Sequence, residues 1–299
     1  MSKKILYFGF LLFLFIFLIF LPKKIDSTDS NGVWDCYLVS PTSAPKLPKW
    51  YGIKNIKEKC LIDGGEETRK NISKILSGVI FHGSREKNYI ALTFDADMTP
   101  EMKKSLKEKQ IDSWYNKKII EILEKNEIKA TLFLSGMWVE TYPNETRKLF
   151  ENPLFELGNH SYSHPAFEKK CYGLTPIIEN DRELQIVKTQ KILKEVTGID
   201  NTLFRFPGGC YLESDINAVN KEEMNVIQWD SEGADGFNNN TKLIINNVLK
   251  TTQNGSIIVL HLHGGYFAPK TADALPEIIS ELKKRGFIFV KVTELINFM

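Results

Sequence analysis

Short apolar segments alternate with amphipathic helical patterns from residue 89 to the end of the chain, and this alternation limits the available folds more than any other feature. Seven runs have the length and composition of buried strands: residues 89–94, 130–135, 155–159, 203–206, 225–229, 256–261 and 287–290. Helical patterns between them include residues 113–126, 177–196, 242–251 and 272–284. Such alternation is typical of a parallel sheet covered by helices. We therefore expect an α/β fold, a distorted or incomplete (β/α) barrel with about seven parallel strands.

The start of the chain has a different character, because residues 5–21 form an apolar run broken only by Gly9 and flanked by lysines. A helix of this length is at the short end of what spans a bilayer. No small residues follow the run, which favours an uncleaved transmembrane helix over a cleaved signal peptide, the alternative interpretation. We expect a membrane anchor at residues 1–24, a linker and N-terminal extension at 25–88 with a helix around 66–76, and a folded domain at 89–299.

Charge and cysteine content narrow the functions further. The chain has 39 basic and 37 acidic residues, a net charge of +2, and no basic stripe of the kind that nucleic-acid binding needs. We therefore expect no nucleic-acid partner. An exported chain could oxidise its cysteines, and three pairings are open among Cys36, Cys60, Cys171 and Cys210. The sequence does not predict an oligomeric state.

Four of the five histidines lie in two close pairs, each at the end of an expected strand. His160 and His164 are spaced i and i+4, and one turn of helix would place both imidazoles on one side, where two histidines can bind one metal ion. Two hydrogen-bonded surface histidines are the alternative. His261 follows a buried strand, and a carboxylate from Asp230 or Asp235 beside it would raise its pKa and favour a proton-donating form.

Two carboxylates close the first expected strand. Asp95 and Asp97 are two residues apart, so on an extended chain their side chains point to the same face. A turn that uses Asp for capping, next to Thr99 and Pro100, is the alternative. Together with the two histidines, one Asp could complete a two-histidine, one-carboxylate metal site. The other could act as general base on a water molecule.

The segment Arg205-Phe-Pro-Gly208-Gly209 ends another expected strand. An Arg at this point could hold a carboxylate through a charge-assisted pair and orient it. Gly208 and Gly209 would let backbone N–H groups approach a substrate oxygen. A plain turn is the alternative.

These segments, taken in order, resemble the five motifs of the polysaccharide deacetylase family, also called the NodB-homology or carbohydrate esterase family 4 domain. The resemblance extends over residues 89–291. The matching residues are Asp95, Asp97, His160, Ser161, His164, Arg205, Pro207, Gly209, Asp235, Leu260 and His261. Three positions depart from the family pattern. Ala96 stands where the metal-binding Asp usually lies, Gly208 replaces an aromatic residue, and Gly236 and Phe237 replace a Trp.

The resemblance implies a metal site. Asp97, displaced by one position from the usual place, would bind a divalent ion together with His160 and His164. The ion would most often be zinc, with cobalt or nickel as alternatives. The extra histidine, His263, would be a supporting hydrogen-bond donor, and His82 would be structural.

The resemblance also implies the remaining roles. Asp95 would be the general base, oriented by Arg205, and His261 would be the general acid, tuned by Asp235. Backbone groups at Gly208 would help to bind the oxyanion.

The activity implied is hydrolysis of N-acetyl groups on a polysaccharide that contains N-acetylglucosamine: peptidoglycan, a chitin-like polymer or poly-N-acetylglucosamine. We expect the catalytic domain outside the cytoplasmic membrane, held by residues 5–21 or secreted after signal cleavage. A degenerate family member that binds glycan without cleaving it is the alternative, suggested by Ala96 and Gly236. A relative acting on a small amide or cyclic imide fits the expected anchor poorly.

Overall fold

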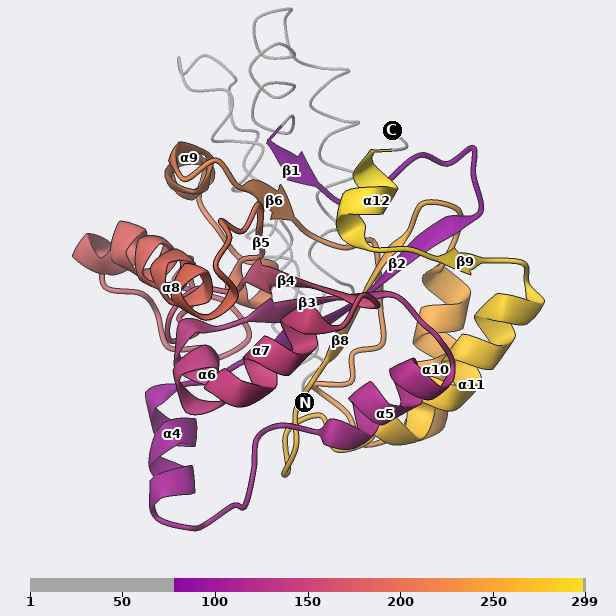
Figure 1. The fold of residues 1–299 in the computed structure, drawn as a ribbon, viewed down its shortest axis with the longest axis horizontal. Coiled ribbons are helices and arrows are strands. Elements are labelled where there is room, and N and C mark those ends of the chain that lie inside the picture. The colour runs from indigo at the N-terminus through magenta and orange to yellow at the C-terminus, as the bar shows by residue number, and fades with distance from the viewer. Residues whose placement is uncertain (1–77, 298–299) are drawn as a thin grey trace, which may run out of the picture. The chain divides into compact units, whose positions relative to one another are not determined.

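The computed structural model describes residues 78–297, which form one sheet with helices packed around it (Figure 1). The described strands are β1 Val79–Ile80, β2 Tyr89–Ala96, β3 Ala130–Leu134, β4 Phe155–Asn159, β5 Leu203–Phe204, β6 Asn225–Ile227, β7 Ser231–Glu232, β8 Ile257–His261 and β9 Ile288–Phe289. All seven expected strands are present, several of them shorter at one end. Strands β1 and β7 were not predicted, because β1 lies in the segment expected to be an extension and β7, Ser231–Glu232, has no apolar residue.

The strands follow the order β1-β6-β5-β4-β3-β2-β8-β7, with β9 paired to β2. Every ladder between the described strands is parallel. Within residues 78–297, β1 and β7 stand at opposite ends of this order and do not pair with each other, so the barrel is left open. The prediction of an incomplete parallel barrel is therefore confirmed.

The helices of the described part are α4 Pro100–Lys107, α5 Lys117–Lys125, α6 Gly136–Thr141, α7 Pro143–Glu151, α8 Arg182–Thr197, α9 Glu213–Lys221, α10 Thr241–Thr251, α11 Thr271–Lys284 and α12 Val292–Ile296. The four helical patterns correspond to α5, α8, α10 and α11. Helix α5 begins later than the expected residue 113, because Tyr115 instead pairs with His263 in an isolated antiparallel bridge. Capping defines other boundaries: Thr99 accepts a hydrogen bond from the Met102 N–H at the start of α4.

Strand β2 lies at the centre of the sheet, between β3 and β8, and it positions the site. Its alternate residues Leu92, Phe94 and Ala96 are fully buried in the main hydrophobic core, which includes residues of α5, α10 and α11. Because strand side chains alternate between faces, Thr93 and Asp95 point to the opposite side, into the barrel. A core strand therefore delivers a carboxylate to the inside of the barrel.

Several sequence expectations lie outside the described residues. They are the apolar run at 5–21, the helix around 66–76, and the cysteines Cys36 and Cys60. Among residues 78–297, no helix is long and apolar enough to cross a membrane. The other two cysteines, Cys171 and Cys210, form a disulfide, which resolves one of the pairings left open by the sequence.

Candidate active site

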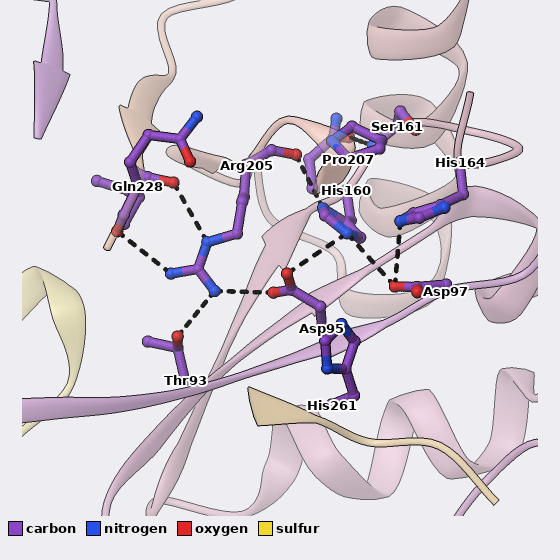
Figure 2. Close-up of polar contacts among 12 residues, drawn as sticks. Thr93, Asp95, Asp97, His160, Ser161, His164, Arg205, Pro207, Gln228 and His261 are labelled. Atoms are coloured by element: carbon purple, nitrogen blue, oxygen red, sulfur yellow. Dashed lines mark hydrogen bonds and ion pairs between the residues drawn. The ribbon is translucent and has the colours of Figure 1, made fainter. Parts of the chain in front are cut away.

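Six of the predicted site residues lie together at the carboxyl ends of the strands in Figure 2: Asp95, Asp97, His160, His164, Arg205 and His261. Asp95 is the penultimate residue of β2, His160 directly follows β4, and Arg205 directly follows β5. His261 is the last residue of β8 and pairs in register with Asp95. This edge is where parallel barrels place their chemistry, because the connecting loops there leave room for a ligand.

Asp97, His160 and His164 form a buried group that could hold a metal ion, and we call it the metal cluster. One ligand atom from each lies within 4.8 Å of the others. Asp97 Oδ1 is 3.4 Å from His160 Nε2 and 3.4 Å from His164 Nε2. The two imidazoles thus face the same carboxylate oxygen, as Figure 2 shows.

The helical turn expected for the histidine pair is wrong. Residues 160–164 form a loop in which Ser161 and His164 have left-handed backbones, with φ of 64° and 57°. Local hydrogen bonds hold this loop, since the Ser161 N–H donates to Asn159 Oδ1 and the Ser163 N–H donates to Gln185 Oε1. The imidazoles still converge, with ring centroids 4.9 Å apart. Convergence therefore comes from the loop rather than from helical periodicity.

The metal cluster contains buried ligand atoms that have no hydrogen-bond partner and could bind a cation. His160 Nδ1 donates to the Arg205 carbonyl at 2.9 Å, so Nε2 is the ring nitrogen that faces the cluster and can bind an ion in its deprotonated form. That Nε2 and Asp97 Oδ1 are buried without a hydrogen-bond partner. Burial, opposed by Asp97, lowers the pKa of His164 to about 4, so its imidazole is neutral near pH 7. One carboxylate oxygen and two imidazole nitrogens form a donor set suited to zinc, so the residues fit the ion.

Asp95 is held by a buried Arg. Arg205 is fully buried, and its Nη1 donates to Asp95 Oδ1 and to Thr93 Oγ1, each at 2.7 Å. Its guanidinium lies over the Phe133 ring, 4.0 Å from the centroid. The second carboxylate oxygen, Oδ2, faces His160 Nε2 at 3.7 Å. Sequence reasoning missed Thr93, although its position two residues before Asp95 places it on the same strand face.

The two glycines after Arg205 lie in a tight turn, Pro207–Gly209, where both have positive φ. A Cβ on Gly208 would lie 2.6 Å from Cys171 Sγ, so no larger residue fits without rearrangement. The Gly209 N–H donates to the Phe206 carbonyl within the turn. Of the two backbone N–H groups predicted to face a substrate oxygen, that of Gly209 already forms a hydrogen bond within the turn.

His261 and Asp235 form the second half of the site, and we call them the acid pair. His261 Nδ1 is 2.8 Å from Asp235 Oδ1, and the backbone N–H of His261 donates to Asp235 Oδ2 at 2.9 Å. Thr271 Oγ1, from the first residue of α11, donates to the same Oδ2. Burial would lower the pKa of His261, but Asp235 outweighs it and raises the value to about 10.

The other candidate carboxylate, Asp230, has a structural role. It pairs with Arg85 at 2.5 Å and accepts from the Ile257 N–H. His82 is exposed, and its ring bonds the neighbouring Gly83 carbonyl. Sequence reasoning missed Thr271, which is far along the chain from Asp235 and carries no motif.

Fold and site together define a class: an open parallel (β/α) barrel with an Asp-His-His group beside a buried Asp and a carboxylate-paired His. A family model described as polysaccharide deacetylase matches residues 82–227. A peptidoglycan-N-acetylglucosamine deacetylase from Bacillus cereus is 31% identical over 210 residues, which cover 70% of this chain and 69% of that protein. The chain therefore belongs to the polysaccharide deacetylase family, and the family expected from the motifs is confirmed.

Solved structures agree with this assignment. One is a peptidoglycan N-acetylglucosamine deacetylase with a TM-score of 0.64 and 29% identity, covering 76% of this chain and 97% of that one. Another is a mutant of a carbohydrate esterase family 4 pseudoenzyme with restored enzymatic activity. It has a TM-score of 0.61 and 25% identity, covering 74% of this chain and 71% of that one.

Proposed function

We propose that this chain is a metal-dependent hydrolase that removes N-acetyl groups from the N-acetylglucosamine units of a polysaccharide, with peptidoglycan as the preferred candidate. The observation that carries the proposal is the meeting of the metal cluster, Asp95 and the acid pair at one edge of the sheet. The names of the similar proteins support peptidoglycan as the substrate.

In this proposal Asp97, His160 and His164 bind one divalent ion, zinc first, with cobalt and nickel as alternatives. The buried Asp97 Oδ1 and His160 Nε2, which have no hydrogen-bond partner, support the assignment. When bound, such an ion supplies Lewis acidity, which polarises a carbonyl oxygen and lowers the pKa of a water molecule.

Asp95 is the general base. Arg205 and the strand fix its carboxylate, so that Oδ2 faces the metal cluster. There it takes a proton from the water that attacks the acetamide carbonyl. The Gly208 N–H is the backbone donor that we assign to the oxyanion, because the Gly209 N–H is already used in the turn.

His261 is the general acid. Its Nδ1 is held by Asp235, and with a pKa of about 10 the ring is protonated throughout the neutral range. As the tetrahedral intermediate collapses, the carbon–nitrogen bond breaks and His261 protonates the departing amine. The products are acetate and a glucosamine unit.

We also propose that residues 5–21 anchor the chain in the cytoplasmic membrane, with the catalytic domain outside; secretion after cleavage is the alternative. The catalytic domain is proposed for residues 89–299, after an anchor at 1–24 and an extension at 25–88. Strand β1, at Val79–Ile80, pairs with β6, so the sheet already uses part of that extension.

The test is acetate release by the purified full-length chain, loaded with zinc, from a panel of acetylated glycans. The panel contains peptidoglycan, chitin oligomers and poly-N-acetylglucosamine. If the chain removed acetate from the N-acetylmuramic acid units of peptidoglycan and not from N-acetylglucosamine, the proposed sugar would be wrong. Metal binding with no acetate release from any member would support the degenerate glycan-binding alternative and contradict the proposal.

A further inference from the structure

The metal-binding carboxylate sits at an unusual place relative to the sheet. Ala96, the last residue of β2, pairs with Leu134 of β3 and lies in the main hydrophobic core. A carboxylate at this position would face apolar side chains, because strand neighbours point to opposite faces. Asp97 returns to the same side as Asp95, but it lies beyond the last residue of the strand.

A histidine contacts Asp97 beyond the end of the strand. His263 lies two residues after the end of β8, and its side chain is only 4% exposed. Its Nε2 is 2.9 Å from Asp97 Oδ2. The two oxygens of Asp97 are thus divided: Oδ2 meets His263, while Oδ1 faces His160 and His164.

The backbone around His263 is itself fixed. His263 forms an antiparallel bridge with Tyr115, and the Gly264 N–H donates to the Trp114 carbonyl at 2.9 Å. The Leu262 N–H donates to the Asp95 carbonyl at 2.8 Å. The imidazole therefore projects from a rigid segment. His263 also lies outside the three-residue group whose ligand atoms converge within the described part of the chain.

We propose that His263 is a positioning residue for the metal centre: by donating from Nε2 to Asp97 Oδ2, it holds the carboxylate so that Oδ1 faces the ion. Asp97 lies beyond the end of β2, so the hydrogen bonds of the sheet do not fix its orientation. His263 fixes it instead. Hydrogen bonds to ligating groups commonly change metal affinity by about 10- to 100-fold. This inference rests on the proposed function only through its metal centre.

The test compares two substitutions in the full-length chain. His263→Leu removes the donor and keeps a similar volume, whereas His263→Gln retains a side-chain N–H. His82→Gln is the matched control, because His82 is exposed, its ring bonds the neighbouring Gly83 carbonyl, and it lies outside the metal cluster. The measurements are zinc affinity by chelator competition, the visible spectrum of the cobalt-loaded chain, and the unfolding midpoint without metal.

We expect His263→Leu to weaken zinc binding by about 10- to 100-fold and to change the cobalt spectrum. His263→Gln should recover part of the affinity, and the control should match the unchanged chain. A positioning role predicts affinity loss even where the metal-free unfolding midpoint is unchanged.

Wild-type affinity and an unchanged cobalt spectrum in His263→Leu would overturn the inference while leaving the proposed function intact. If His263→Leu does not fold, His263→Ala serves as the variant without a donor. The inference would then be overturned if His263→Gln and His263→Asn, which keep a side-chain N–H, bound zinc no more tightly than His263→Ala. Failure of the unsubstituted chain to bind any divalent ion would overturn both the metal centre and this inference.

Discussion

The metal cluster and the acid pair lie at the same edge of the sheet, but they are completed differently. In the metal cluster, Asp97 Oδ1 and His160 Nε2 are buried without hydrogen-bond partners. In the acid pair, both oxygens of Asp235 accept hydrogen bonds, from His261 and Thr271. Since a buried polar atom without a partner is unfavourable, one half of the site needs a ligand and the other is complete by itself. Metal dependence and pH dependence should therefore be separable by mutation.

The largest effect should come from removing Asp97, the proposed metal ligand beyond the end of β2. Asp97→Ala deletes the carboxylate that faces both imidazoles, so the chain should lose bound zinc and its turnover should fall to background. Metal content by elemental analysis and acetate release check this. Asp200→Ala, at an exposed carboxylate paired with Lys194, is the control and should change neither. Retention of both metal and activity would mean that Asp97 is not a ligand.

Removing the proposed base should separate turnover from metal binding. Asp95→Asn keeps the shape of the side chain but cannot take a proton, so turnover should fall by roughly 10²- to 10⁴-fold. Zinc content should stay at the wild-type level, because Asp95 lies outside the three-residue metal cluster. A variant that lost metal in parallel with activity would show that the two carboxylates act as one unit.

The acid pair should control the alkaline limit of activity. Turnover should fall as pH rises through about 10, where His261 loses its proton. In Asp235→Asn the pKa should return toward the ordinary value of about 6.5, which reduces the protonated fraction at pH 8 by about thirtyfold. The measurement is kcat against pH, with Asp273→Asn, an exposed carboxylate, as the control. An alkaline limit that does not move would exclude His261 as the acid.

The same pair links stability to pH. The pKa of His261 is higher in the folded chain than in the unfolded one, so its contribution is complete below about pH 6.5. That contribution is lost as pH rises through about 10. Denaturant midpoints of wild type and Asp235→Asn should therefore approach each other above that pH.

The smallest effect on the chemistry should come from the disulfide. Cys171–Cys210 joins the segment after His164 to the turn that contains Gly208, which is the metal side of the site. The double substitution Cys171→Ser, Cys210→Ser should cost about 2–4 kcal/mol in the free energy of unfolding and weaken zinc binding modestly. The alkaline limit set by the acid pair should stay unchanged, as kcat profiles would reveal. A shifted limit would show that the two halves are mechanically coupled.

Apolar strand patterns predicted the sheet because β2, β3 and β8 are buried on both faces, which leaves a continuous apolar signal. The motifs correctly brought together Asp95, Arg205, His261 and Asp235. The helical turn predicted for His160 and His164 was wrong, because an i, i+4 spacing does not distinguish a helical turn from a loop with two left-handed residues. Tertiary partners such as Thr271 are invisible in sequence, since only folding brings the start of α11 to Asp235.

The buried guanidinium of Arg205 has an evolutionary consequence. Asp95 is the carboxylate that neutralises this cation, which sits over an aromatic ring with no exposure to water. A chain that lost the carboxylate would keep an uncompensated charge in its interior, a penalty on the order of 3–5 kcal/mol. Loss of the proposed base through drift is thus opposed by folding itself, and a descendant that lost Asp95 would recover stability by replacing Arg205 as well.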